Sequence, residues 1–321
     1  MQRPILFVNF GGPRSLEEIE SFLIALLTDR DVIRTKLPYF LQKRLFTRVA
    51  KKRTKKVAKD YLLIGGKSPI YEDTEAIALA VSHRLGISVQ TFHRYLLETH
   101  DQFLQTLQSP AIVFPLFPQF SYATTGSIAR FFAETIDPKL VGQLRWIKSY
   151  PAHPAYVAVM QRCLREFMEE KKLQEAETFL LFSAHGLPQE FVDTGDIYES
   201  ECQLSFRAIS AGFPEAVSLL SYQSKFGRGE WLRPYTDEVC QSISSRVKGR
   251  KNVVIVPLSF TSDHIETLFE IEELYLPPIR EAGLAAHRCP ALNRRPDWLD
   301  AICQIAQETN LCSNQMLVRS K

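Results

Sequence analysis

The residues best suited to chemistry follow an apolar segment in the last third of the chain. Residues 253–256 (VVIV) and Pro257 have the composition of a buried parallel strand. In open α/β sheets, ligands bind at the carboxyl ends of the strands, where low-dielectric surroundings shift the pKa values of acids. Just beyond this segment the chain presents three carboxylates and an imidazole, at Asp263, His264, Glu266 and Glu270.

A second apolar segment, residues 178–184, leads in the same way to a histidine. His185 follows it in a loop that contains a glycine and Pro188. The alternative is a hydrogen-bonded loop histidine without function, but the small residues Ser183 and Ala184 leave room for a bulky ligand beside the ring. Two strand ends that carry histidine and carboxylates favour a site that handles a metal ion or protons.

The spacing of the acidic segment limits how its side chains can meet. Ser262 or Asp263 is a suitable N-cap for the helix that follows. On a regular helix Glu266 and Glu270 share a face, where like charges raise one another's pKa. His264 and Glu266 would point in nearly opposite directions, so the three side chains converge only if the first turn is irregular, for instance as a π-bulge. The alternative interpretation is a solvated acidic helix face.

A strongly basic segment spans residues 34–59. It contains eleven Lys and Arg and no acid, so the remaining 28 basic and 36 acidic residues give the rest of the chain a net charge of −8. An amphipathic basic helix can lie on an anionic membrane or bind a phosphate backbone, although a solvated basic face is the commonest outcome. Interleaved apolar side chains favour a lip that contacts a membrane or an apolar ligand. They are Leu37, Tyr39, Phe40, Leu41, Leu45, Phe46 and Val49.

Strand–helix alternation along the 321 residues predicts an α/β fold with mostly parallel sheets covered by helices. Ser15 and Glu18 form a capping-box pattern at the start of the first helix. A break at Tyr150-Pro151 predicts an N-terminal lobe, 1–150, with the basic and aromatic segment as its lip, and a C-terminal lobe, 151–321, with a terminal helix. The predicted strands are 4–10, 87–95, 111–117, 144–150, 178–184, 216–222, 252–259 and 283–288, and the predicted helices include 72–85, 155–172 and 297–309.

Composition and motif content argue against several classes of protein. Contents of 45% apolar and 23% charged residues are typical of a soluble globular enzyme. Apolar runs are too short to span a membrane, and the N-terminus lacks a signal-peptide pattern. Six cysteines without a C-x-x-C pair favour buried thiols in a reducing cytoplasm. Dinucleotide, Walker and G-x-S-x-G motifs do not occur, so nucleotide binding and serine acyl transfer have no support.

Several motifs of the sequence resemble those of ferrochelatases, in the same order and over nearly the whole chain. The resemblance implies two Rossmann-like lobes of the chelatase type, with an active cleft between them. It also implies insertion of Fe(II) into protoporphyrin IX to form protohaem, the last step of haem biosynthesis, without an organic cofactor. The matching motifs are VNFGGP (8–13), YLLIGGKSPI (61–70), PLFPQFSYATTGS (115–127), FSAHGLP (182–188), SYQSKFGRGEWLRPYT (221–236) and VPLSFTSDHIETLFEIEELY (256–275).

The same resemblance implies roles for individual residues. His185 matches a histidine that binds the metal and accepts pyrrole protons, and Glu266 matches the carboxylate that opposes it as metal ligand or proton acceptor. His264 and Glu270 match the catalytic neighbours of this pair. Contacts with the porphyrin and its propionates are implied for Phe10, Arg53, Tyr61 and Ser68.

Further expectations concern cofactors, partners and location. Animal-type ferrochelatases carry an iron–sulfur cluster on C-terminal cysteines, and here Cys312 alone cannot hold one, so no cluster is expected. Porphyrin and ferrous iron are the expected partners, without nucleic acid. The expected location is the cytoplasm, with peripheral contact of the lip at the inner membrane surface.

Other activities stay open at this point. A coproporphyrin ferrochelatase, or a chelatase for another tetrapyrrole or for cobalt or nickel, would use the same nitrogen and oxygen ligands. A non-catalytic porphyrin or haem carrier belongs to a different class. Such a carrier needs apolar walls and one axial ligand, so the acid at Glu266 opposite a histidine favours the enzyme.

Overall fold

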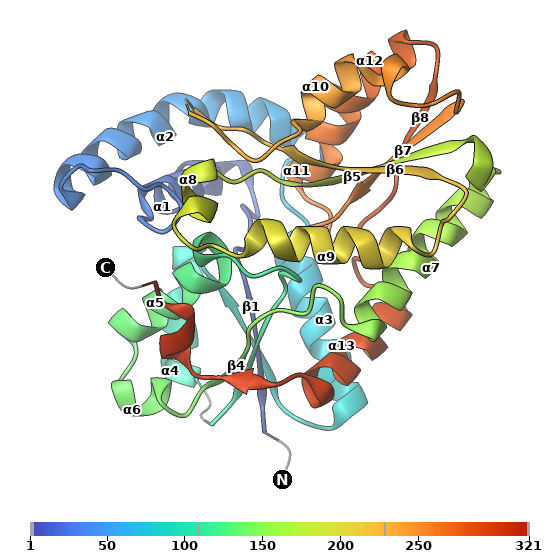
Figure 1. Ribbon diagram of the computed structural model, residues 1–321. Helices are drawn as coiled ribbons and strands as arrows, with labels where there is room; N and C mark the ends of the chain where they lie inside the picture. Colours follow the sequence, from blue (N-terminus) through green and yellow to red (C-terminus); the bar gives the residue numbers. More distant parts are fainter. Residues whose placement is uncertain (1–2, 108–109, 228, 320–321) are drawn as a thin grey trace. The chain divides into compact units, whose positions relative to one another are not determined.

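The structure, a computed structural model, describes residues 3–107, 110–227 and 229–319. The chain divides into two compact units, one made of Met1–Ser149 with Ile302–Lys321 and the other of Tyr150–Ala301. Each unit is built on one β-sheet with helices against it (Figure 1). The predicted α/β class with parallel sheets covered by helices is therefore confirmed.

The first unit holds a five-stranded sheet with the strand order β2-β1-β3-β4-β9. Four of its strands run parallel, and all five residues of β1 are buried, as expected for a strand covered on both faces. One face is covered by α3 and the other by α4 and α5 (Figure 1). The elements are β1 (Ile5–Asn9), α1 (Ile19–Thr28), α2 (Tyr39–Leu62), α3 (Ile70–Leu85), β2 (Val89–His93), α4 (His100–Thr106), β3 (Ile112–Pro115), α5 (Ser127–Thr135), α6 (Pro138–Val141), β4 (Arg145–Ile147) and β9 (Leu311–Cys312).

The second unit holds a four-stranded parallel sheet with the order β6-β5-β7-β8. Buried side chains of β5, β7, α10 and α12 form one apolar core on one face, and α9 lies on the other face with α7 beside it (Figure 1). The elements are α7 (Pro154–Glu170), β5 (Thr178–His185), α8 (Gln189–Asp193), α9 (Tyr198–Ser210), β6 (Val217–Gln223), α10 (Thr236–Gln241), β7 (Asn252–Pro257), α11 (Ile265–Leu268), the π-helix η6 (Glu270–Tyr275), α12 (Leu276–Glu281), β8 (Ala285–Arg288) and α13 (Pro296–Glu308).

The C-terminal segment differs from the expectation that residues 151–321 form one lobe. Helix α13 begins in the second unit, but the chain from Ile302 onward is part of the first. There β9 pairs antiparallel with β4, with Trp146 opposite Cys312. The physical reason is that β4 would otherwise be the edge of its sheet, with unpaired backbone groups that β9 now satisfies.

The predicted strands occur, but the predicted capping box does not. All eight predicted strands occur, most of them as apolar runs bounded by turn residues, whereas β2 (VQTFH) and β8 (AAHR) mix apolar and polar residues. The predicted capping box is wrong, since the Ser15 side chain makes no capping hydrogen bond. The Glu18 carboxylate instead accepts hydrogen bonds from the backbone N–H (2.8 Å) and Nε (2.9 Å) of Arg14. Arg14 thus occupies the carboxylate that would have accepted from the Ser15 backbone N–H in a capping box.

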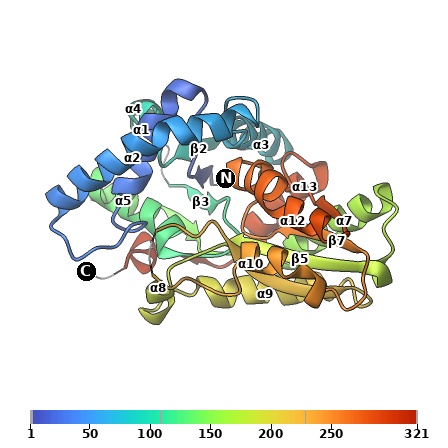
Figure 2. The ribbon, with the colours of Figure 1, turned by 90° about the horizontal axis from the view of Figure 1, so that it is seen from above.

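Most of the basic segment forms the long helix α2, which packs beside α1 (Figures 1 and 2). Only three of its residues are buried, and the large apolar side chains near its start are exposed, with Phe40 69% accessible. Within the described ranges, no helix combines the length and apolarity needed to cross a bilayer. The helix therefore presents cations and apolar side chains together to solvent.

Candidate active site

Strand β5 delivers His185 at its carboxyl end. The backbone N–H of His185 donates to Ser259 Oγ (3.2 Å), and its carbonyl accepts from the Tyr198 hydroxyl (3.0 Å). Its Nδ1 lies 2.5 Å from the carbonyl oxygen of Gly186. Because a carbonyl oxygen only accepts, Nδ1 carries the hydrogen, and in the neutral ring Nε2 keeps a lone pair. The strand thus presents a nitrogen that can bind a metal ion or a proton.

The backbone after β7 is not arranged as the sequence pattern predicts. His264 is the N-cap of α11, with an extended backbone (φ −160°, ψ −168°), so the predicted N-cap at Ser262 or Asp263 is wrong. The reason is that the Asp263 carboxylate is already bonded to Arg288 (2.9 Å) and Asn293 (2.9 Å). These contacts occupy the group that would have capped the helix.

Irregular backbone brings the histidine and the acids of this segment together. His264 precedes the first turn, Glu266 lies on the four-residue helix α11, and Glu270 begins the π-helix η6. Such π-turns shift the side chains that follow and recur at functional sites. The irregularity that the spacing of these residues requires is therefore present.

The predicted catalytic residues of the second unit form one cluster around Glu266. Its Oε1 lies 3.7 Å from His185 Nε2, and its Oε2 lies 3.6 Å from His264 Nε2. Among the described residues, the buried atom Glu266 Oε2 has no hydrogen-bond partner. A buried carboxylate oxygen without a donor is costly, so this atom is suited to a ligand or a proton.

The two carboxyls of the cluster have pKa values on opposite sides of their usual value. Burial alone would raise the pKa of Glu266, but the imidazoles of His185 and His264 lower it below the usual 4.5. Burial, followed by the charge of Glu266, raises the pKa of Glu270 to about 7. Glu266 is thus ionised at neutral pH, whereas Glu270 exchanges a proton there.

Gln223, the last residue of β6, and Ser224, which follows it, complete the cluster, and sequence reasoning gave them no role. Ser224 Oγ donates to Glu270 Oε2 (2.5 Å), as does the Tyr275 hydroxyl (3.2 Å). Gln223 Nε2 donates to the backbone carbonyl of Glu266 (2.8 Å) and to Glu270 Oε2 (3.2 Å). Their position at the carboxyl end of a third parallel strand is the signal that could have identified them.

The pair of His185 and Glu266 fits one divalent ion. First-row ions such as zinc bind imidazole nitrogen and carboxylate oxygen at about 2.1 Å, so donor atoms up to about 4 Å apart can share one ion. The observed separation of 3.7 Å between Nε2 and Oε1 lies within that limit. In the described part of the chain, no group of three or more His, Cys, Asp or Glu is arranged to hold a metal ion.

Two of the predicted porphyrin contacts, Phe10 and Ser68, lie near the carboxyl end of β1 in the first unit. The Phe10 ring is partly exposed, with centroids 5.0 Å from Tyr95 and 4.8 Å from Phe117. Ser68 is buried against Gly12, where an added Cβ would lie 2.4 Å from Ser68 Oγ. Porphyrin contact by Ser68 would therefore require a local rearrangement, and both roles stay predictions.

The other two predicted porphyrin contacts are on helix α2. Arg53 is partly exposed, whereas Tyr61, in the last turn, is 4% accessible. The carbonyl of Tyr61 accepts hydrogen bonds from Ile64 and Gly66 as the chain leaves the helix. The porphyrin contacts of Arg53 and Tyr61 also stay predictions.

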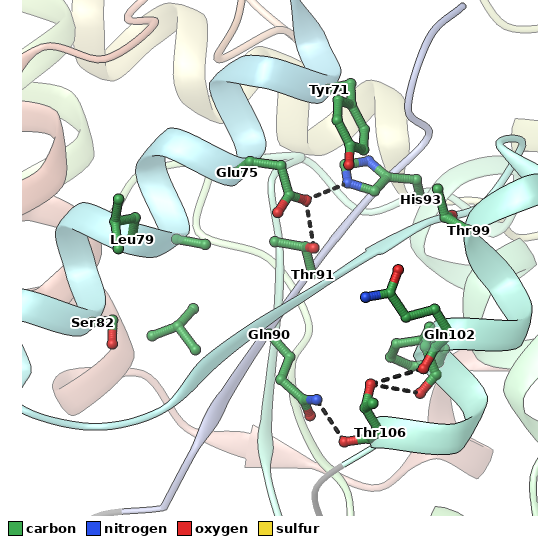
Figure 3. A pocket seen from close by; sticks show the side chains of 13 residues that line it. Tyr71, Glu75, Leu79, Ser82, Gln90, Thr91, His93, Thr99, Gln102 and Thr106 are labelled. Carbon is green, nitrogen blue, oxygen red and sulfur yellow. Dashed lines mark hydrogen bonds and ion pairs between the residues drawn. The ribbon is translucent and has the colours of Figure 1, made fainter. Parts of the chain in front are cut away.

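A cavity of about 390 Å³ lies in the first unit, between α3, β2 and α4, and contains none of the predicted site residues. Figure 3 shows Glu75 of α3 pointing toward Thr91 and His93 of β2. Glu75 Oε1 lies 2.9 Å from His93 Nε2 and accepts from Thr91 Oγ1 (2.6 Å). Hydroxyl and amide groups make up most of the remaining polar lining, so the residues that line this cavity hold one histidine–carboxylate pair, without the second histidine and second carboxyl found around Glu266.

The sequence matches a known protein family over almost its whole length. A sequence model of the ferrochelatase family matches residues 2–310. The ferrochelatase of Chlamydia abortus is 45% identical over 319 residues, and that of Chlamydia caviae is 44% identical over 319 residues; in both cases 98% of each chain is covered. The chain belongs to the ferrochelatase family. The resemblance seen in its motifs is therefore confirmed.

Solved structures extend the likeness of this ferrochelatase-family chain to the fold of other chelatases. CbiX, described as the terminal enzyme for siroheme biosynthesis in denitrifying bacteria, superposes with a TM-score of 0.54 at 15% identity, over 96% of this chain and 100% of that one. SirB from Bacillus subtilis, solved with Fe³⁺, gives a TM-score of 0.53 at 11% identity, over 96% and 95%. At such identities the likeness shows the fold alone, and it confirms the predicted chelatase-like architecture.

Proposed function

We propose that this protein inserts Fe(II) into protoporphyrin IX to form protohaem. The observation that carries the proposal is the pair of His185 Nε2 and Glu266 Oε1, 3.7 Å apart, with the second oxygen of Glu266 making no hydrogen bond among the described residues. Membership in the ferrochelatase family supports the same reaction. Iron is the substrate here, and the reaction needs no organic cofactor or iron–sulfur cluster.

The cluster can account for both protons that metallation releases. Each pyrrole N–H must lose its proton as an Fe–N bond forms, so two acceptors are required. Because Nδ1 of His185 donates to the Gly186 carbonyl, Nε2 is the ring nitrogen that faces Glu266 and can accept a proton, and Glu266 is ionised. With its pKa of about 7, Glu270 can take a proton from this pair and pass it on to solvent at neutral pH. We assign His264 the role of holding Glu266 ionised.

Porphyrin binding is assigned to the first unit. We propose that Phe10 contacts the macrocycle, since its ring is partly exposed and large aromatic surfaces stack on flat rings. We propose that Arg53 pairs with a propionate, because guanidinium groups bind carboxylates through paired hydrogen bonds. Tyr61 and Ser68 are proposed to contribute after a local rearrangement.

The test is a metallation assay under anaerobic conditions. Purified protein is mixed with protoporphyrin IX and Fe(II), and the Soret absorption of the metalloporphyrin is followed. Parallel reactions with coproporphyrin, and with Co(II) or Ni(II) in place of iron, separate the related chelatase activities. Tight porphyrin binding without turnover for every pair would contradict the proposal and favour a carrier.

We propose further that the protein works in the cytoplasm and touches the inner membrane through residues 34–59. The support is the exposure of Tyr39, Phe40 and Leu41 at the start of a helix whose charges are all positive before its last turn. Such a helix binds anionic lipid by apolar insertion and charge attraction. Liposome flotation should show binding to vesicles with anionic lipid and its loss with neutral lipid or high salt. Failure to float on anionic vesicles at low salt would refute this contact.

A further inference from the structure

A buried carboxylate precedes the catalytic segment and anchors its start. Asp263 Oδ1 accepts from Arg288 Nη1 (2.9 Å) and from Thr267 Oγ1 (2.8 Å), and Oδ2 accepts from Asn293 Nδ2 (2.9 Å). Thr267 Oγ1 in turn accepts from the backbone N–H of His264 (2.9 Å). The position of the His264 backbone therefore depends directly on the Asp263 carboxylate.

Arg288 joins this start of the segment to its middle. Its Nη1 bonds Asp263, and its Nε donates to Glu272 Oε1 (3.0 Å) in the π-helix η6. The Arg288 side chain is only 15% exposed. Its planar guanidinium can be buried because two carboxylates bond it. His264, Glu266 and Glu270 all lie between these two anchor points in the sequence.

The backbone of Arg288 is itself fixed in the sheet that carries His185. Arg288 is the last residue of β8 and is in register with Ile255 of β7. The N–H of the next residue, Cys289, donates to the Ile255 carbonyl (2.9 Å), and β7 pairs with β5. One side chain thus connects the sheet that positions His185 with the segment that positions Glu266.

We infer that Arg288 is a positioning residue that sets the separation of His185 and Glu266 and the approach of Glu270 to them. The inference rests on the proposed function for its meaning but concerns a residue outside the catalytic cluster. Displacements of about 1 Å in such a cluster cost rate, and losing a residue that supports metal ligands typically lowers activity about 10- to 100-fold. A lysine at this position offers a point charge, which cannot bridge both carboxylates with the same geometry.

A matched pair of variants tests this role, Arg288→Gln and Arg280→Gln. Arg280 approaches the same Glu272 carboxylate at 4.0 Å but is 53% exposed, and its Nη2 donates to the Ala286 carbonyl (3.3 Å). Both variants lose one positive charge near Glu272. We expect Arg288→Gln to lower kcat for metallation about 10- to 100-fold with little change in the Kd for porphyrin, and Arg280→Gln to stay near the wild-type rate. Arg288→Lys should recover part of the loss.

A pH profile distinguishes positioning from a general loss of folded protein. The groups that face Glu270 are Glu266 of α11, His185 of β5, Gln223 of β6, Ser224 after β6 and Tyr275 of η6. If Arg288→Gln loosens the segment, water reaches Glu270 and its pKa falls, because burial is what raises it. The acid limb of the rate profile then moves to lower pH. A smaller folded fraction would lower the rate by the same factor at every pH and would leave the acid limb at the same pH. Glu272→Gln, which removes only the more exposed arm of the bridge, gives a milder variant if Arg288→Gln folds poorly.

The outcomes separate this inference from the proposed function. Equal rates and pH profiles in Arg288→Gln and Arg280→Gln, with an active wild type, would overturn the role of Arg288. An inactive wild type would refute the proposed function alone. In that case crystal structures of wild type and Arg288→Gln, which need no porphyrin, decide: the same separation of His185 Nε2 and Glu266 Oε1 in both would overturn the role of Arg288.

Discussion

The raised pKa of Glu270 leads to a measurable effect on stability. Its value of about 7 in the folded protein, against 4.5 for an ordinary glutamate, means that folding favours the protonated form. The stabilising contribution is fully present below about pH 4.5 and is lost as the pH rises through about 7. At 1.36 kcal/mol for each pKa unit, the loss amounts to about 3 kcal/mol.

The perturbation that removes this contribution is Glu270→Gln. An amide oxygen can still accept from Ser224, Gln223 and Tyr275, but the side chain no longer ionises. We therefore expect the free energy of unfolding of the variant, relative to wild type, to increase by about 2 to 3 kcal/mol between about pH 5 and pH 8. Most of the change falls between pH 5 and 7, where native Glu270 stays protonated and the unfolded residue does not.

Urea unfolding at several pH values measures this difference. The free energy of unfolding falls linearly with urea concentration, so its value in water is obtained by extrapolation for each variant. Glu273→Gln is the matched control, since Glu273 is an exposed glutamate three residues further along the same segment. The control should follow the wild-type curve. A difference between Glu270→Gln and wild type that stays constant with pH would refute the assignment of a protonated Glu270.

Three further results are expected. His185→Ala should abolish metallation while porphyrin binding persists, because it removes the nitrogen 3.7 Å from Glu266; retained turnover would refute its role. Gln223→Met should lower the free energy of unfolding by about 2 to 4 kcal/mol in urea titrations, because a buried amide that bonds Glu266, Glu270 and Ser183 is lost; a change below about 0.5 kcal/mol would contradict this. Gly12→Ala should destabilise the first unit by about 1 to 3 kcal/mol, since its Cβ would lie 2.4 Å from Ser68 Oγ, and Ser68→Gly in the same chain should restore stability; no rescue would show that this contact is not the cause.

The amino-acid sequence by itself was sufficient for the strands, the family and the location of the candidate site. Apolar runs of four to eight residues are the local signal for most of the eight predicted strands, and all eight occur. His185 and the segment that begins at His264 could be placed at strand ends because parallel strands present their carboxyl ends to one edge. The ferrochelatase motifs identified the family for the same reason, since they are contiguous stretches of sequence.

Only the tertiary structure decided the contacts between residues distant in sequence. The return of β9 to the first sheet depends on its pairing with an edge strand, with Trp146 opposite Cys312, 166 residues later. A strand of two residues has no periodicity that could reveal this pairing in the sequence. The N-cap at His264 depends on Arg288 and Asn293 bonding Asp263, and the raised pKa of Glu270 depends on its burial beside Glu266. Propensity and spacing act over a few residues, whereas hydrogen-bond partners and desolvation are set by whatever the fold brings near, so the chemistry of the cluster could not be derived from the sequence alone.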